Sequence, residues 1–238
     1  MRHDTNIVAS NTSPDWRPEH ALAEYVQNAL DEGAGWLVTL DGEIMTISDV
    51  GRGMMRSGWL YNKTDKISSE AKGQFGNGSK RAACVLLREG RQIQVDTVGY
   101  SVEPILAPSA LDASETTLQL DIFDTTRERG TVVTIAPVSR EEYLAACAMF
   151  LETESLAGVE RVRVTDTLSY RIIDGTPTGG NVYVHGARCH QTAAALDYNL
   201  TGKDVRNVIA EGRHKGIPVE ALRLHCGRVW QSSAQAFN

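Results

Sequence analysis

The sequence lacks three features that would each have assigned the protein to a broad class. It has four cysteines among 238 residues, and no two of them form a CxxC pair. It also has no apolar run near the roughly 20 residues that span a membrane, and its first residues lack the apolar core of a signal peptide. We therefore expect no cysteine-based zinc site, no membrane span and a reducing, cytoplasmic location.

An excess of positive charge is also missing. The chain has 24 Lys and Arg residues against 30 Asp and Glu residues, which gives a formal net charge of -6. A dedicated nucleic-acid binder carries a basic footprint, so the global charge disfavours that class and leaves room only for a local basic patch. The hydrophobic fraction of 42% is ordinary for a globular protein, and the length fits one domain with a second, smaller unit.

Helical and strand patterns are mixed along the first part of the chain. A helix is predicted from Pro18 to the glycines at 33 and 35, because apolar residues recur there at helical spacing and proline suits a first turn. Two β-type runs joined by Asp41-Gly42 predict a hairpin. A second helix is predicted at 79–89, and the further strands are expected at 91–100, 115–123 and 130–137. This is an α+β pattern, with a helical layer over a mostly antiparallel sheet.

Three segments are predicted from these patterns. Residues 1–16 are polar and form an N-terminal arm, residues 17–137 form the first domain, and residues 138–238 form a smaller α/β domain. The second domain begins with a helix at about 139–152, for which Ser139 is the expected N-cap. Hairpin strands at 159–165 and 168–174 follow, then a strand at 181–186 and a helix at 203–214.

The first motif with chemical content lies on the first helix, in EYVQNALDEG. Glu24, Asn28 and Asp31 fall on one face, opposite the apolar stripe. Most such stripes are solvated surfaces. The functional interpretation is specific, because an amide oxygen is a ligand that Mg²⁺ accepts and a carboxylate one turn away can serve as a general base.

The second motif is DVGRGM, at the end of the second hairpin strand. An acidic residue with two glycines ends many strands as a simple turn. In the functional interpretation, Asp49 accepts a hydrogen bond from an exocyclic amine, and Gly51 and Gly53 leave room for a flat base. Thr131, which opens a later strand, offers a hydroxyl that could complete recognition of the same edge.

The third motif is KGQFGNGSKRA, residues 72–82. It differs from a Walker A loop, because Ser79 separates the last glycine from Lys80 and no strand immediately precedes it. It is still a glycine-rich turn leading into a helix N-terminus, where N–H groups and the helix dipole attract phosphate. Alone, this segment would be interpreted as a flexible loop.

In this order, the three motifs and the later strand that Thr131 opens resemble the N box and the three glycine boxes of the GHKL superfamily. These are the Bergerat-fold ATPases that include gyrase B, MutL and the MORC proteins. EYVQNALDEGAG is similar to the MutL and MORC form of the N box, and GQFGNGSK to the MORC form of the lid box. The resemblance covers about residues 17–137. It implies a Bergerat-fold two-layer sandwich, followed by a transducer-like domain.

The resemblance implies a role for each matching residue. Glu24 would be the general base for the hydrolytic water, and Asn28 would bind Mg²⁺. Asp49 would accept a hydrogen bond from the adenine amine, with Thr131 beside it. The other nucleotide-binding residues would be Asp31, Gly51, Gly53, Met54, Gly73, Gln74, Phe75, Gly76, Asn77, Gly78 and Lys80.

The implied function is Mg-dependent ATP binding and slow hydrolysis that drive closure of a lid at 54–72 and a conformational or dimerisation switch. The implied partners are ATP, a second copy of the chain and an unidentified protein. Two alternatives stay open: a nucleotide-binding sensor or inhibitor that does not hydrolyse, and a DNA clamp in the manner of MutL or MORC. A narrower likeness, of NVYVHGARC and LDYNLTGKDVRN to phage rIIA-like proteins, implies a phage-related origin and a bacterial host cytoplasm.

Overall fold

The structure is a computed structural model that describes residues 1–33, 35–59, 77–165 and 167–200. The chain divides into two compact units, Met1–Ala146 and Cys147–Asn238. The α+β class is confirmed, because the chain forms two mostly antiparallel sheets and few helices. Within the described ranges, no helix is long and apolar enough to cross a membrane.

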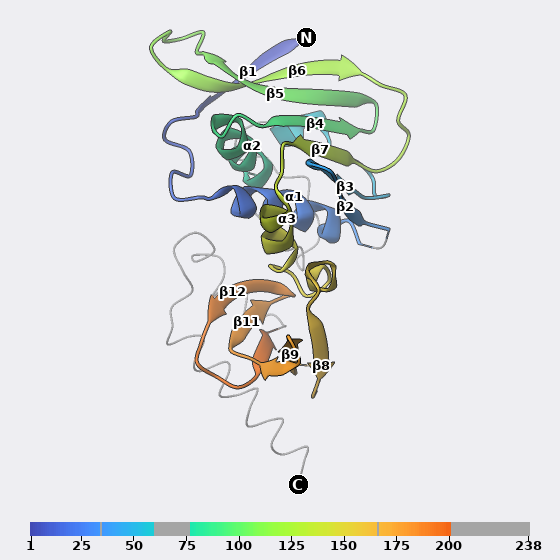
Figure 1. The fold of residues 1–238 in the computed structure, drawn as a ribbon. Coiled ribbons are helices and arrows are strands. Elements are labelled where there is room, and N and C mark those ends of the chain that lie inside the picture. The colour runs from blue at the N-terminus through green and yellow to red at the C-terminus, as the bar shows by residue number, and fades with distance from the viewer. Residues whose placement is uncertain (34, 60–76, 166, 201–238) are drawn as a thin grey trace. The chain divides into compact units, whose positions relative to one another are not determined.

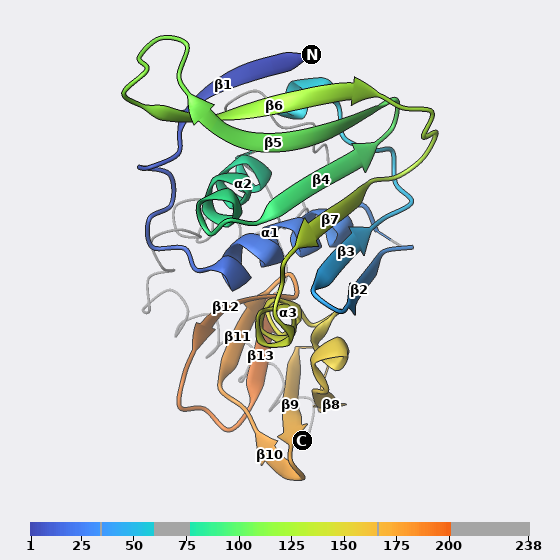
Figure 2. The same ribbon diagram turned by 45° about the horizontal axis from the view of Figure 1, so that its top comes forward.

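The first unit is built on a seven-stranded sheet. Its order is β1-β6-β5-β4-β7-β3-β2 (Figure 2), and every neighbouring pair is antiparallel. The strands are β1 (Arg2–Val8), β2 (Leu37–Asp41), β3 (Ile44–Ser48), β4 (Gln92–Thr97), β5 (Tyr100–Pro108), β6 (Thr116–Asp124) and β7 (Val132–Ala136).

Helices α1 (Pro18–Asp31) and α2 (Gly78–Arg88) lie together on one face of this sheet (Figure 1). Strand side chains alternate between the two faces, and the face under the helices is apolar, with Met45 and Val95 fully buried. The helices contribute Leu22 and Val26, which are also fully buried. A short 3-10 helix, η1 (Arg56–Trp59), and α3 (Arg140–Cys147) complete the unit.

Several predicted elements are confirmed. Helix α1 begins at Pro18, and the hairpin of β2 and β3 turns at Asp41-Gly42, with Gly42 at a positive φ of 57°. Ser139 caps α3: its hydroxyl accepts the Glu142 N–H (3.2 Å), and the Glu142 carboxylate accepts the Ser139 N–H (2.9 Å). This reciprocal pair is a capping box.

Cys84 and Cys147 are fully buried, and burial raises the pKa of the Cys84 thiol to about 11.

Two sequence expectations are corrected. The strand expected at 91–100 is two strands, because the chain turns at Gly99, where φ is 75°, and β5 begins at Tyr100. The arm expected at 1–16 contains β1, which pairs with β6 of the same chain. Its sequence has no strand alternation because β1 lies at the sheet edge and only Ile7 is buried.

The helix expected at 139–152 is shorter than predicted and lies in the first unit. The Arg91 guanidinium pairs with the Glu142 carboxylate (2.5 Å), and the Tyr143 hydroxyl donates to the carbonyl of Val38 (3.3 Å). These contacts tie α3 to β2 and to the start of β4. The division into compact units falls after Ala146, whereas the sequence patterns place the domain boundary near Pro137.

The second unit contains a six-stranded sheet in the order β10-β9-β13-β11-β12, with β8 beside β9. Strands β8 and β9 form the predicted hairpin, and β11 matches the predicted strand at 181–186. Among the described strands of this sheet, only β11 and β13 pair in parallel. The predicted helix at 203–214 lies outside the described residues. The elements are η2 (Glu154–Ala157), β8 (Glu160–Arg163), β9 (Leu168–Ile173), β10 (Thr176–Thr178), β11 (Asn181–Val184), β12 (Ala187–Gln191) and β13 (Asp197–Leu200).

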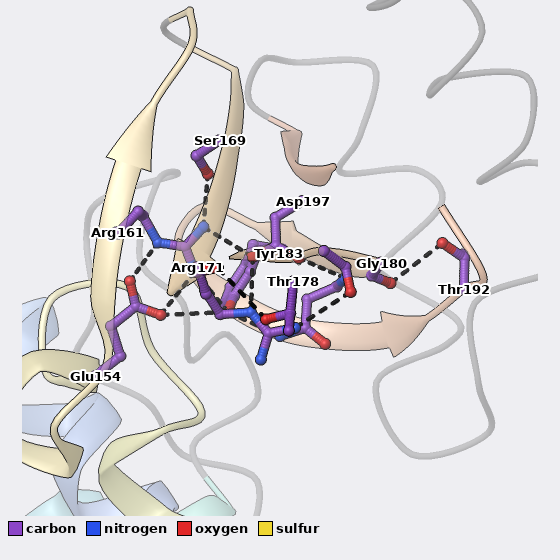
Figure 3. A network of polar contacts seen from close by, with 11 residues as sticks. Glu154, Arg161, Ser169, Arg171, Thr178, Gly180, Tyr183, Thr192 and Asp197 are labelled. Carbon is purple, nitrogen blue, oxygen red and sulfur yellow. Dashed lines mark hydrogen bonds and ion pairs between the residues drawn. The ribbon is translucent and has the colours of Figure 1, made fainter. Parts of the chain in front are cut away.

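A buried polar network joins these strands (Figure 3). The Arg161 guanidinium makes two hydrogen bonds to the Glu154 carboxylate and one to Asp197 (2.9 Å). Asp197 is fully buried and also accepts hydrogen bonds from Arg171 (3.0 Å) and from the Asn181 N–H (2.7 Å). Two acids and two arginines therefore balance in charge. They link η2, β8, β9, β11 and β13.

Replacing Asp197 by Asn should destabilise the second unit. The change removes one carboxylate and leaves two guanidinium groups partly buried, and breaking a buried ion pair from one side costs about 3–5 kcal/mol. We expect the amides of Val182 and Val184 to exchange hydrogen roughly 10²–10⁴-fold faster than in the wild type. The exposed Glu160→Gln variant should exchange at the wild-type rate. Equal exchange in both variants would show that the network adds no stability.

Candidate functional site

Three polar side chains share one row of the first sheet, at the carboxyl ends of β3 and β4 and the start of β7; this end of the strands is called the sheet edge below. Strand β7 lies between β3 and β4, and its register pairs Val132 with Ser48 on one side and Asp96 on the other. One step further along the strands, Asp49, Thr131 and Thr97 follow in the same row. Their side chains lie on the buried face, because Ile47, Val133 and Val95 lie two residues away and are buried.

The turn after Asp49 is held against this row. The Asp49 carboxylate accepts the N–H of Gly51 (2.8 Å), and Gly51 in turn accepts the N–H of Gly130 at its carbonyl (2.8 Å). A Cβ on Gly130 would overlap the backbone carbonyl of Asp49, and its φ of 66° also disfavours a side chain. Glycine at 130 therefore lets the segment before β7 lie directly on the acidic turn.

A second group of polar side chains lies where α1 meets the start of α2. The Asn28 amide donates to the Ser79 hydroxyl (2.9 Å), and the Tyr25 hydroxyl donates to the Ser79 carbonyl (3.1 Å). A Cβ on Gly78 would overlap the Glu24 carboxylate. Gly78, the first residue of α2, thus lets Glu24 lie against the helix N-terminus, where the helix dipole favours negative charge.

Lys80 is almost fully buried one residue later. Its ammonium donates to the carbonyl of Gly58 in η1 (2.6 Å), and its side chain is only 1% exposed. Asn77 precedes the helix as its N-cap residue, and its carbonyl accepts the first helical bond, from Arg81 (3.0 Å). The first N–H groups of an α-helix have no intrahelical acceptor, so this terminus presents donors close to a buried cation.

Helix α1 connects the two groups. Its C-cap residue, Glu32, accepts the N–H of Arg52 (3.4 Å) and forms an ion pair with the Arg52 side chain (3.7 Å). Glu24 and Glu32 are eight residues apart on a helix that rises about 1.5 Å per residue, so about 12 Å separates them along the axis. One helix therefore places a carboxylate at each end of the candidate site.

Burial dominates the electrostatics of Asp49. The side chain is 9% exposed, and the loss of water raises the pKa of its carboxyl, an effect to which the negative charge of Glu32 adds. The Gly51 N–H opposes this shift by stabilising the ionised form. A buried acid held beside a second acid is typical of a functional site and costs folding stability at neutral pH.

The sequence-predicted residues thus fall into two described clusters and one undescribed segment. Asp49, Gly51, Gly53, Met54 and Thr131 lie at the sheet edge, while Glu24, Asn28, Asn77, Gly78 and Lys80 lie at the junction of α1 and α2. Asp31 ends α1 and is partly buried. The remaining predicted residues lie outside the described residues; they are Gly73, Gln74, Phe75 and Gly76.

Sequence reasoning missed two residues of the site, Thr97 and Glu32. Thr97 is fully buried, accepts the Met54 N–H (2.8 Å) and contacts the Thr131 hydroxyl (3.1 Å). A threonine at a strand end is ordinary, so only the register of β4 against β7 could have found it. Glu32 follows the predicted acidic stripe directly, but the C-cap position turns it toward Arg52.

Comparisons with known proteins find few relatives in sequence. No family model matches the chain. The chain is 29% identical over 167 residues to an uncharacterized protein of Mycoplasma pneumoniae, and the match covers 64% of this chain and 66% of that protein.

Among solved structures, the chain is similar to the ATPase region of Saccharomyces cerevisiae topoisomerase II, with a TM-score of 0.42 and 7% identity over 72% of this chain and 62% of that one. It is also similar to the ATPase and transducer domains of topoisomerase II from Balamuthia mandrillaris, with a TM-score of 0.43 and 12% identity over 79% and 66% of the two chains. The chain thus spans just under two thirds of the length of these relatives and of the Mycoplasma protein. Likeness at this level assigns no activity.

Replacing Asp49 by Asn should stabilise the unliganded protein near neutral pH. A raised pKa means that the folded state binds the proton more tightly than the unfolded state, so the stabilisation is present at low pH and is lost as the pH rises through the folded pKa. Asn is neutral throughout and can still accept the Gly51 N–H. The gain in unfolding free energy should therefore be largest at about pH 7 and vanish below the ordinary Asp pKa of about 3.9.

Urea denaturation across this pH range measures the effect, with Asp41→Asn in the exposed hairpin turn as the matched control. A loss of stability in Asp49→Asn at neutral pH would contradict the electrostatic interpretation of this side chain.

Proposed function

We propose that the first unit is a GHKL-type nucleotide-binding domain that binds ATP with Mg²⁺ and hydrolyses it slowly. One observation carries the proposal: helix α1 spans the distance between two groups. Near one end lies the buried acceptor Asp49, and near the other lies the N-terminus of α2 with the Glu24 carboxylate beside it. A base with an exocyclic amine fits the first end, and a chain of phosphates fits the second. The sequence resemblance to the N box and glycine boxes points to the same ligand.

In this proposal the base is recognised at the sheet edge. Asp49 has one oxygen on the Gly51 N–H, and its second oxygen would accept from the adenine amine. Thr131 lies beside it in the same row and would bond the neighbouring ring atom. Gly51, Gly53 and Met54 form the turn next to this row. A Cβ on Gly51 would overlap Glu32, and a Cβ on Gly53 would overlap Val98, so the two glycines let the turn pack closely beside the proposed base.

The phosphates would lie at the start of α2. Backbone N–H groups of Gly78 and its neighbours, together with the helix dipole, favour an anion there. The buried Lys80 ammonium adds a positive charge nearby. The Glu24 carboxylate lies against Gly78. When the phosphates bind, it would rotate aside or share this space with the attacking water.

The residues present fit a magnesium ion held jointly with phosphate. The Asn28 amide donates through its nitrogen to Ser79, and its amide oxygen would ligate the ion. Mg²⁺ commonly takes one or two protein oxygens and completes its shell with water and substrate phosphate. In the described ranges no group of three or more His, Cys, Asp or Glu residues could hold a metal by itself. When bound, the ion would neutralise phosphate charge.

Glu24 would act as the general base. Its carboxylate would hold a water molecule near the terminal phosphate and accept a proton as that water attacks. The position of Glu24 beside the N-terminus of α2 favours an ATPase over a sensor that does not hydrolyse, because a sensor needs no carboxylate at that point. A DNA clamp is less supported, since the net charge is negative. In the full cycle, closure of the lid and dimerisation would pass the nucleotide state to a partner or to a transducer-like second unit.

Phosphate release from Mg-ATP tests the catalytic assignment directly. Glu24→Ala should lower the rate by roughly 10²–10⁴-fold, the usual contribution of a general base, with little change in ATP affinity. Glu19→Ala is the matched control, because Glu19 lies on the same helix and pairs with the exposed Arg17 (2.9 Å). Equal rates in the two variants would remove Glu24 from the mechanism. Binding without turnover in the wild type would favour the sensor alternative.

ATP should also protect residues 54–80 from proteolysis, as expected if this segment closes over the phosphates. Residues 60–76 lie outside the described residues, so this prediction rests on the sequence. Limited proteolysis with and without Mg-ATP, followed by mass spectrometry, locates the cleavage sites. Asp49→Asn, which should lose ATP binding, is the control and should be cut equally in both conditions. Equal cleavage of the wild type would contradict a closing lid.

A further inference from the structure

Thr97 has a buried hydroxyl that the proposed mechanism does not use. It ends β4, is fully buried and lies in the row of Asp49 and Thr131. Its hydroxyl oxygen accepts the Met54 N–H (2.8 Å) and lies 3.1 Å from the Thr131 hydroxyl oxygen. A buried hydroxyl is almost always hydrogen-bonded through its own hydrogen as well.

The need for an acceptor for the Thr97 hydroxyl hydrogen fixes the direction of the hydrogen bond between the two threonines. Within the described part of the chain, the Thr131 oxygen is the one acceptor within reach of the Thr97 hydroxyl hydrogen. Thr97 must therefore donate to Thr131, since the opposite direction would leave the Thr97 hydrogen buried without an acceptor. That choice fixes a chain of donors running from the Met54 N–H through Thr97 to Thr131.

The consequence falls on Thr131. Its oxygen accepts from Thr97, so its own hydrogen points elsewhere, and no described residue accepts it. The side chain is 8% exposed. Asp49, next in the row, presents an acceptor: one carboxylate oxygen accepts the Gly51 N–H, and the Thr131 backbone also stabilises the carboxylate. The edge of the site thus offers a fixed donor directly beside an acceptor.

We propose that Thr97 is a positioning residue that sets base selectivity by holding the Thr131 hydroxyl as a donor. The inference rests on the proposed nucleotide function and names its ligand class more narrowly. A 6-aminopurine presents an amino donor beside a ring-nitrogen acceptor, which complements Asp49 and Thr131. A 6-oxopurine presents a carbonyl acceptor beside a ring N–H donor, which opposes both groups. A Thr131 hydroxyl that could turn would tolerate either base.

The test compares ATP with inosine triphosphate, which differs from ATP only at the purine 6-position and the protonation of its ring nitrogen. Dissociation constants for both are measured by titration calorimetry with the full chain. The wild type should prefer ATP. Thr97→Val should reduce the ratio of the two constants by about tenfold, the value of one hydrogen bond. Thr97→Ser, which keeps the hydroxyl, should retain the wild-type ratio.

Thr134→Val is the matched control, because Thr134 lies on β7 with its side chain on the opposite face from Thr131. It should leave the ratio unchanged. Thr97→Cys replaces the hydroxyl by a weak donor and should lower the ratio, so a comparison of the Ser and Cys variants decides the matter if Thr97→Val does not fold.

The ratio of the two dissociation constants distinguishes a role of Thr97 in base selectivity from a purely structural role, in which Thr97 only holds the turn at Met54. An equal loss of affinity for both nucleotides in Thr97→Val, or equal ratios in the Ser and Cys variants, would overturn the positioning role and leave the proposed function intact. Failure of the wild type to bind either nucleotide would overturn both.

Discussion

The position of β7 between β3 and β4 is the constraint on which the candidate site depends. Because β7 is antiparallel to both neighbours, β3 and β4 run in the same direction and end at the same edge of the sheet. Register then places Asp49, Thr131 and Thr97 in one row, although they lie far apart in sequence. A slip of one residue in any of these three strands would turn its polar residue to the opposite face, so the apolar core under α1 and α2 also fixes the polar site.

The site accepts costs that an ordinary core avoids. A carboxylate, an ammonium and a threonine pair are buried within one unit, each held by specific backbone groups: the Gly51 N–H for Asp49, the Gly58 carbonyl for Lys80 and the Met54 N–H for Thr97. Buried polar groups destabilise a fold when unpaired. Their retention here, beside glycines against which other groups pack closely, is the pattern expected at a functional site.

Local signals in the sequence predicted much of this arrangement. Proline at 18, Asp41-Gly42 and the apolar spacing of α1 act over a few residues, and the elements they predict are present. Edge strand β1 was missed because five of its seven residues are polar and only Ile7 is buried. The turn at Gly99 was hidden inside a continuous β-type run. Thr97 and the Arg161–Asp197 network depend on strand register, which no single-sequence pattern specifies. Asp49 and Glu24 were found only because their motifs occur together.

The proposed function requires one ligand that extends from Asp49 to the N-terminus of α2. A crystal structure of the chain with Mg²⁺ and a non-hydrolysable ATP analogue tests it most directly. The purine amine should lie within hydrogen-bond distance of the Asp49 carboxylate, and the phosphates should lie beside Gly78 with Glu24 facing the terminal phosphate. A nucleotide bound elsewhere, or placed in the reverse direction along α1, would contradict it.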